Sequence, residues 1–262
     1  MKEYRLRVKE KIMKADLATI RREYTKGGLK RSDLPDNPLV LFTKWLQEAI
    51  DAEVNEPTAM LVGTVSPEGK PAIRTVLLKD LHDGKFIFYT NYGSRKGKHL
   101  AHNPSISISF VWHELERQIH IEGIAAKVSP QESDEYFRKR PYKSRIGARI
   151  SPQSEPIESR IQLIRDFVKE TTRWIGKEID RPEYWGGFAV MPVRVEFWQG
   201  RVNRLHDRFL YMLQSDGVWK IERLGLSCNS WGITLCNFPF MHTPLLIYTG
   251  RTSYLPLHEM KP

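Results

Sequence analysis

The stretch Ser105–Val128, "SISISFVWHELERQIHIEGIAAKV", indicates the fold more clearly than any other part of the chain. Apolar and polar residues alternate strictly from Ser105 to Phe110, and a second alternating run follows the short segment "HELE". Side chains of a β-strand point alternately to opposite faces, so this pattern predicts two half-buried strands joined as a hairpin. We therefore expect an antiparallel sheet with one face on the core.

Similar strand patterns occur on both sides of this hairpin. "TAMLVGTVS" and "AIRTVLLKDL" flank the turn "PEGK", "FIFYTN" follows "HDGK", and "FAVMPVRVEFWQG", "DRFLYMLQ" and "VWKIERL" come later. About eight strands in consecutive hairpins predict a mainly β fold that closes into an antiparallel barrel. A parallel doubly wound sheet fits poorly, because the strands do not alternate with helices and no G-x-G-x-x-G motif is present.

Four segments predict helices around the sheet. The first starts at Asp36 or Asn37, with Pro38 in its first turn, and the second starts at Ser94 and stops before Pro104. The third starts near Ser129, and "IESRIQLIRDFVKETTRWIG" forms a longer amphipathic helix. The predicted fold class is thus mainly β with flanking helices (α+β).

Composition limits the classes of function. The 262 residues are 40% hydrophobic and 27% charged, as in ordinary globular domains. The net charge of +10 comes mostly from residues 1–31, which carry eleven Lys/Arg against four Asp/Glu. We predict a basic, partly mobile arm over residues 1–35, no nucleic-acid partner and no membrane partner, and a cytoplasmic protein. No metal motif is present, and the two cysteines match no zinc spacing.

Cations gather where strands end and helices begin. In "YTNYGSRKGKHL", Arg95 and Lys96 fall in the first turn of a predicted helix, where the free N–H groups favour an anion over a cation. A phosphate site and an exposed basic turn are equally good interpretations of this cluster alone. "RTVLLK" and "YFRKRPYKSRIGA" add further cations and hydroxyls, again as a site or as solvated faces. No hydrolase motif accompanies them, which favours a cofactor that performs the chemistry while the protein holds it.

Ten motifs in order together resemble one family. They are "RREYTKGGL", "RTVLLK", "FYTNYGSRKGKHL", "LERQ", "YFRKRP", "SRIGA", "SPQS", "YWGGF", "EFWQG" and "NRLHDRF". They are similar to the pyridoxine/pyridoxamine 5′-phosphate oxidase family over roughly residues 20–224. The resemblance implies an FMN-binding split β-barrel of antiparallel Greek-key type, acting as a homodimer with FMN at the interface. It also implies oxidation of pyridoxamine or pyridoxine 5′-phosphate to pyridoxal 5′-phosphate, by hydride transfer from C4′ to flavin N5, in vitamin B6 biosynthesis and salvage. Dioxygen would reoxidise the flavin and yield hydrogen peroxide.

The resemblance also implies residue roles. The implied FMN-binding set is Arg74, Thr75, Val76, Leu77, Leu78, Lys79, Tyr89, Thr90, Arg95, Lys96, Gln118, Gln153, Ser154, Trp198 and Arg208, of which Trp198 and Arg208 would act across the dimer. The implied substrate-binding set is Arg21, Tyr24, Lys79, Tyr136, Arg140, Ser144, Arg204, Leu205 and His206. Arg204 and His206 would be catalytic, Arg204 by pressing the substrate ring onto the flavin and His206 by orienting or deprotonating the reacting substituent. Arg201 has no implied role, and we expect it to be a solvated turn residue.

Several points stay open at this level. The arm around Arg21 and Tyr24 either closes over the site as a lid or simply packs on the barrel. The domain is expected over residues 36–224, and residues 225–262 form an atypical tail in which we expect little regular structure and no catalytic role. Two other functions remain possible: a split-barrel flavoprotein with a different substrate, and a non-catalytic module that binds polyanions, flavin or pyridoxal phosphate.

Overall fold

The computed structural model describes residues 20, 23–151 and 153–225. Its strands are β1 (Ala59–Val65), β2 (Pro71–Leu77), β3 (Asp80–His82), β4 (Lys85–Asn91), β5 (Ser105–Trp112), β6 (Arg117–Lys127), β7 (Trp185–Gln199), β8 (Asp207–Leu213) and β9 (Trp219–Arg223). Its helices are α2 (Pro38–Asp51), α3 (Arg95–His102), α4 (Pro130–Lys139), α5 (Tyr142–Ile150) and α6 (Arg160–Arg173), with short 3₁₀ turns η2 (Arg31–Asp33), η3 (His113–Leu115) and η4 (Val202–Arg204). Arg21 and residues 226–262 of the predicted tail lie outside the described residues.

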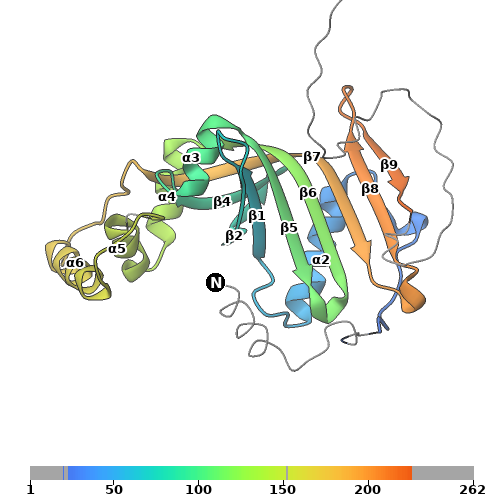
Figure 1. Cartoon of the computed structure of the whole chain (residues 1–262), viewed down its shortest axis with the longest axis horizontal. Coiled ribbons are helices and arrows are strands. Elements are labelled where there is room, and N and C mark those ends of the chain that lie inside the picture. The colour runs from blue at the N-terminus through green and yellow to red at the C-terminus, as the bar shows by residue number, and fades with distance from the viewer. Residues whose placement is uncertain (1–19, 21–22, 152, 226–262) are drawn as a thin grey trace, which may run out of the picture. The chain divides into compact units, whose positions relative to one another are not determined.

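All strands belong to one antiparallel sheet, whose order is β2-β1-β5-β6-β7-β4-β3, with β8 added to β7 and β9 to β8 (Figure 1). The mainly β prediction and the β5–β6 hairpin are confirmed, and the hairpin pairs in register from Ser105↔Ile124 to Trp112↔Arg117. The strand order is a path with two ends, however, so the pairing among the described residues does not close a ring. The hairpins alone predicted a closed barrel, which is wrong, whereas the split barrel that the resemblance implied is confirmed.

The split occurs along β7. Its first part pairs with β4 up to Val190, and its second part pairs with β8 from Arg194 onward, while β6 follows it on the other edge. Between the two parts Pro192 has no N–H for a ladder bond, and the register with β6 shifts between Glu122 and Gly123. A Cβ on Gly123 would lie 2.5 Å from the Met191 carbonyl oxygen, so only glycine allows this close approach. The bulge therefore lets one long strand pair with two different strands, β4 and β8, along the same edge.

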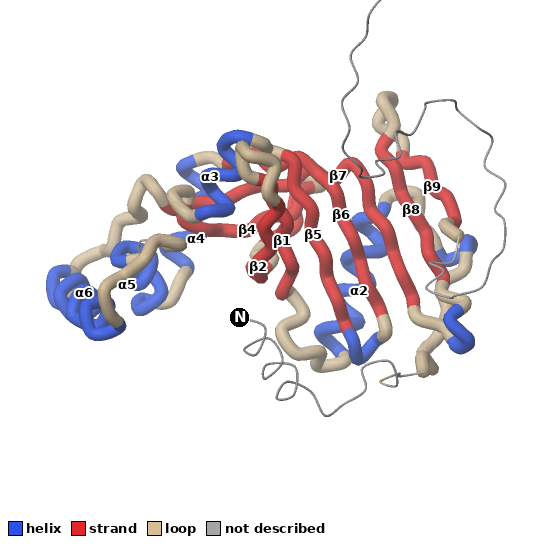
Figure 2. The backbone as a smooth tube through the Cα atoms, viewed as in Figure 1, coloured by secondary structure: helices blue, strands red, loops and turns tan. Residues whose placement is uncertain are grey.

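Helix α2 lies behind strands β6 and β7 in this view and packs against one face of the sheet (Figures 1 and 2). The Asn37 side chain caps it by accepting a hydrogen bond from the Leu39 N–H, and Pro38 occupies its first position. Phe42 is fully buried and packs edge-on against Phe86 and Phe110 at centroid distances of 4.8 and 5.1 Å. This apolar face holds the helix against the sheet.

The other helices begin where local capping signals place them. Ser94 caps α3 and Ser129 caps α4, as predicted, because a cap bonds to a backbone N–H only three residues ahead. Helix α5 begins at Tyr142, directly after Pro141, and α6 begins at Arg160, where the Ser159 side chain accepts from the Gln162 N–H. In the described part of the chain no helix combines the length and apolar character needed to cross a membrane.

Candidate functional site

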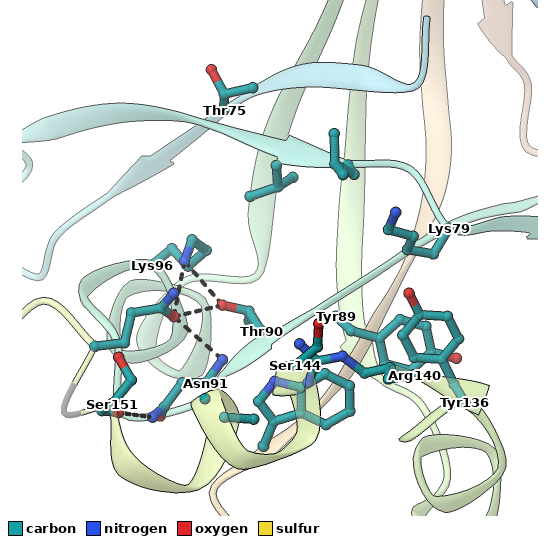
Figure 3. Close-up of a pocket in the computed structure, with 16 residues that line it drawn as sticks. Thr75, Lys79, Tyr89, Thr90, Asn91, Lys96, Tyr136, Arg140, Ser144 and Ser151 are labelled. Carbon is teal, nitrogen blue, oxygen red and sulfur yellow. Dashed lines mark hydrogen bonds between the residues drawn. The ribbon is translucent and has the colours of Figure 1, made fainter. Parts of the chain in front are cut away.

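A cavity of about 490 Å³ opens between the sheet and helices α3, α4 and α5 (Figure 3). Strands β2 and β4 supply one side, and the start of β7 supplies the floor. The lining residues are Thr75, Val76, Leu77, Lys79, Tyr89, Thr90, Asn91, Lys96, Tyr136, Arg140, Ser144, Gly147, Ala148, Ser151, Gln153 and Trp185. Segments more than a hundred positions apart in the sequence thus meet around one space.

Lys96 is a buried cation at one end of this cavity, with 7% of its surface exposed. Its Nζ donates to Thr90 Oγ1 at 2.9 Å and to Ser94 Oγ and Gln153 Oε1 at 3.4 Å each. Burial, and then the charge of Arg74, lower the pKa of Lys96 to about 8. Every one of these partners is neutral, so the charge of Lys96 is left for a ligand to balance.

Arg74 stands beside Lys96 and is anchored to β1. Its Nη1 donates to the Val62 carbonyl oxygen at 3.0 Å and to Thr64 Oγ1 at 2.7 Å, and Thr64 in turn bonds to His99 Nδ1 at 3.0 Å. Burial, and then the charge of Arg95, lower the pKa of Arg74. Three cations and the start of α3 therefore converge without a carboxylate partner among the described residues, which suits a phosphate dianion.

Aromatic rings and Arg140 form the other end of the cavity. Tyr89 stacks on Tyr136 at 3.8 Å between centroids and on Trp185 at 5.5 Å, and the rings are nearly parallel. Gly187 makes room for this stack, because a Cβ there would lie 2.8 Å from the Tyr89 ring. Burial raises the pKa of both tyrosines, so their hydroxyls stay protonated at neutral pH.

Arg140 lies over the face of Trp185, with 4.6 Å between the guanidinium carbon and the ring centroid. Burial lowers its pKa, and its Nη1 is buried without a hydrogen-bond partner in the part of the chain that the structure describes. An unpaired buried guanidinium N–H is costly unless a ligand accepts from it. With Lys79, Tyr136 and Ser144 lining the same cavity, Arg140 defines a second place for an anion.

A separate aromatic cluster forms at the β6–β7–β8 ladder. The Trp198 ring lies 4.6 Å from His206 and 5.5 Å from Tyr24, and Tyr24 lies 5.2 Å from His206. Gln118, Trp198 and Arg208 stand directly opposite one another on three neighbouring strands. Burial, and then the charge of Arg204, lower the pKa of His206, whose Nδ1 accepts a hydrogen bond from the Arg201 N–H at 3.2 Å.

The residues implied by the resemblance therefore fall into two groups within one chain. Eleven of them line the cavity: Thr75, Val76, Leu77, Lys79, Tyr89, Thr90, Lys96, Tyr136, Arg140, Ser144 and Gln153. Four residues lie outside this lining but close to it in the chain: Arg74, whose charge acts on Lys96, Arg95, whose charge acts on Arg74, the buried Leu78 and the exposed Ser154. The second group lies at the β6–β7–β8 ladder and consists of Tyr24, Gln118, Trp198, Arg204, Leu205, His206 and Arg208. Arg21 is outside the described residues.

Three features of the site were not predicted. Trp185, in "YWGGF", forms the base of the aromatic stack, and Asn91 bonds to the Ser151 carbonyl oxygen at 3.2 Å across the cavity wall. In the sequence, the tyrosines and glycines next to these two residues, in "YWGGF" and "YTNYG", were the features that could have indicated them. Arg201 is exposed in the turn after β7, as expected, but its contacts were not predicted: its Nε lies 3.6 Å from Asp207 Oδ2, and a Cβ on Gly28 would meet its guanidinium.

Comparison with known proteins agrees with this architecture. The family model "Pyridoxamine 5'-phosphate oxidase" matches residues 46–175, and "Pyridoxine 5'-phosphate oxidase C-terminal dimerisation region" matches residues 185–225. The structure of PhzG from Burkholderia lata 383, with tetrahydrophenazine-1-carboxylic acid, aligns with a TM-score of 0.72 and 28% identity over 76% of this chain and 98% of that one. A pyridoxamine 5'-phosphate oxidase-related, FMN binding protein from Nostoc punctiforme shares the fold, with a TM-score of 0.60 and 16% identity over 72% of this chain and 97% of that one.

Fold and site thus define a split-barrel protein with a cationic cavity beside its sheet. A pyridoxine/pyridoxamine 5'-phosphate oxidase from Bacteroides fragilis is 76% identical over 209 residues, which are 80% of this chain and 89% of the relative. The chain belongs to the pyridoxine/pyridoxamine 5′-phosphate oxidase family.

Proposed function

We propose that this protein binds FMN and oxidises pyridoxamine 5′-phosphate and pyridoxine 5′-phosphate to pyridoxal 5′-phosphate. The observation that carries the proposal is the pair of donor clusters in one cavity, around Lys96 and around Arg140, where neither cation has a carboxylate partner within residues 23–151 and 153–225. Two phosphate-bearing ligands, a cofactor and a substrate, would balance both. The aromatic rings between the clusters suit flat heterocycles.

The chain's own groups fit FMN at the Lys96 end. Lys96 and Arg74 would carry the charge for its phosphate, with Arg95 at the first turn of α3. Thr90 and Gln153 already hold the Lys96 ammonium in place, so little side-chain freedom is lost on binding. When bound, FMN would accept a hydride from C4′ of the substrate and pass the electrons to dioxygen.

The Arg140 end would hold the substrate phosphate. The unpaired Nη1 of Arg140 would donate to a phosphate oxygen, and Tyr136, Ser144 and Lys79 in the lining of the same cavity would supply further donors. This set distinguishes a phosphorylated vitamer from its free form. A flavoprotein acting on an unphosphorylated substrate would have no need of it.

The second cluster would complete the cavity in a homodimer. Trp198, Arg204, His206 and Arg208 stand outside the cavity of their own chain, within the region matched by the dimerisation model. We propose that the cluster of a second copy closes each cavity, so a dimer holds two sites. Arg204 then positions the substrate ring over the flavin.

His206 acts in this proposal by orienting the substrate. Its Nδ1 accepts from the Arg201 backbone N–H, so the neutral ring carries its proton on Nε2. The lowered pKa keeps it neutral at pH 7. The amine or hydroxyl on C4′ meets an N–H donor, and the proton that this substituent releases goes to solvent.

The proposed reaction consumes one molecule of dioxygen for each molecule of substrate oxidised. Two electrons and two protons leave the alcohol and reduce dioxygen to hydrogen peroxide, giving the aldehyde directly. With the amine, the resulting imine is hydrolysed and releases ammonia. Both routes end at the same product.

The test is to purify the protein, record its flavin absorbance, and follow pyridoxal 5′-phosphate and hydrogen peroxide with pyridoxamine 5′-phosphate as substrate. We expect a bound flavin, equal amounts of the two products, and little turnover of unphosphorylated pyridoxamine. Flavin without product formation would indicate a different flavoprotein, and the absence of flavin after reconstitution with FMN would indicate a binding module.

A further inference from the structure

Glu116 is a buried carboxylate whose partners are backbone amides of the N-terminal arm. Only 3% of its surface is exposed, and it lies at the end of η3 with φ 56° and ψ 41°, in the left-handed region. Its Oε2 accepts from the Thr25 N–H and the Lys26 N–H at 2.9 Å each, and its Oε1 lies 3.1 Å from the Thr25 nitrogen. Such charge-assisted hydrogen bonds stabilise a buried carboxylate, and they also fix the position of the arm backbone at Thr25 and Lys26.

A second carboxylate holds the arm a few residues later. Asp207 Oδ2 accepts from the Leu29 N–H at 3.0 Å, and Arg223 Nη1 bonds to Asp207 Oδ1 at 2.8 Å. Between the two attachments Gly28 lies against the Arg201 guanidinium, where a side chain would collide. Residues 25–29 are therefore fastened at both ends, and the segment packs on the barrel.

This attachment fixes the position of Tyr24, the residue just before it. The Tyr24 ring stands edge-on to Trp198 and to His206, with interplanar angles of 78° and 89°. It also covers Gly200, where a Cβ would lie 2.7 Å from the ring. The Glu116 carbonyl oxygen accepts from the Gly200 N–H at 2.8 Å, so Glu116 joins the arm to the same turn that Tyr24 covers.

We propose that Glu116 is a positioning residue for the oxidation: by binding the Thr25 and Lys26 amides, it holds Tyr24 against the Trp198–His206 pair that closes the substrate site. The inference rests on the proposed function, since Trp198 and His206 act there on the ring system. Glu116 itself touches neither ligand. Because Glu116 acts through the position of the arm, replacing it should raise the KM for the substrate and leave the affinity for FMN unchanged.

The test compares Glu116→Gln with Glu114→Gln in the full chain loaded with FMN. Glutamine keeps the size of the side chain but offers one accepting oxygen instead of a carboxylate, while Glu114 is an exposed acid two residues away that undergoes the same change of charge. We expect Glu116→Gln to raise the KM for pyridoxamine 5′-phosphate about tenfold, the factor for losing one charge-assisted hydrogen bond, with FMN affinity unchanged. Glu114→Gln should match the wild type in both constants.

Hydrogen exchange gives a readout that does not depend on activity. In Glu116→Gln the amides of Thr25 and Lys26 should exchange at least about tenfold faster, and those of strand β6 should not change. Equal exchange of the arm in Glu116→Gln and wild type would overturn the proposal even if the enzyme is active. A wild-type protein that forms no pyridoxal 5′-phosphate would instead refute the proposed function, and exchange alone would then decide whether Glu116 holds the arm.

Tyr24→Ala separates positioning from general destabilisation. If Glu116 acts through Tyr24, the double variant Glu116→Gln/Tyr24→Ala should have the KM of Tyr24→Ala alone, because the ring to be positioned is gone. Independent effects that multiply in the double variant would refute the proposed route. Tyr24→Ala alone also keeps the proposal testable if Glu116→Gln folds poorly.

Discussion

Binding of the FMN phosphate should weaken as pH rises through the pKa of Lys96. In the protein without a ligand, Lys96 is buried among Thr90, Ser94 and Gln153, and its pKa is lowered from 10.5 to about 8. A phosphate dianion beside the ammonium favours the protonated form and raises this pKa again. Binding is therefore coupled to proton uptake above about pH 8, and the affinity falls there by up to about tenfold for each pH unit.

The size of the expected change in FMN affinity follows from the lowered pKa of Lys96. Lowering the pKa of Lys96 from 10.5 to about 8 means that the folded protein disfavours the charged form by about 3 kcal/mol. Between these two pH values the unfolded chain binds more protons than the folded one, so the stability of the FMN-free protein should rise with pH across this window. A phosphate that fully relieves the penalty would gain about a hundredfold in affinity, and Lys96→Met should lose about that factor at pH 7.

The assay is a titration of the FMN-free protein with FMN, followed by flavin fluorescence, between pH 7 and 9.5. Riboflavin is the matched ligand, because it has the same ring system without the phosphate. We expect a falling affinity for FMN, a flat profile for riboflavin, and a flat FMN profile for Lys96→Met. A wild-type FMN profile that is flat across this range, or a riboflavin profile that falls in parallel, would refute the reasoning.

Three further outcomes follow from the packing and the site. Phe42→Ala should lower the free energy of unfolding by about 3–5 kcal/mol in urea, since it empties a fully buried space on the sheet, whereas Val40→Ala on the exposed side of α2 should cost much less. Thr64→Val should weaken FMN binding about tenfold and leave riboflavin unaffected, because Arg74 loses its 2.7 Å anchor; unchanged FMN binding would contradict the role of this bond. Arg204→Met should slow turnover far more than it weakens FMN binding, and equal losses in the two measurements would contradict its proposed contact with substrate.

Local features of the fold could be predicted from the sequence because their causes are local. The alternation from Ser105 to Phe110 identified strand β5, and Asn37, Ser94 and Ser129 identified three helix starts within a residue or two. Each signal involves atoms a few positions apart. The resemblance added the split barrel and the residue roles, which local patterns could not supply.

The split of the barrel could not be read from alternation. Pro192 and Gly123 both suggest irregular strands, but the division of β7 between β4 and β8 depends on which strands come to lie beside it. The same is true of Arg74, whose hydrogen bonds go to β1 and whose charge acts on Lys96 in α3. The split of β7 and the surroundings of Arg74 thus both depend on which distant segments pair with each other.

By itself, then, the sequence determined the strands, the helix caps and the cations at the ends of strands and starts of helices, since these depend on neighbouring residues and composition. Only the tertiary structure decided which cations share a cavity and which aromatic groups stand outside it. It also decided that Glu116, 90 residues from Lys26, holds the arm. A carboxylate acquires such a role only when folding removes it from water and leaves distant backbone amides as its partners.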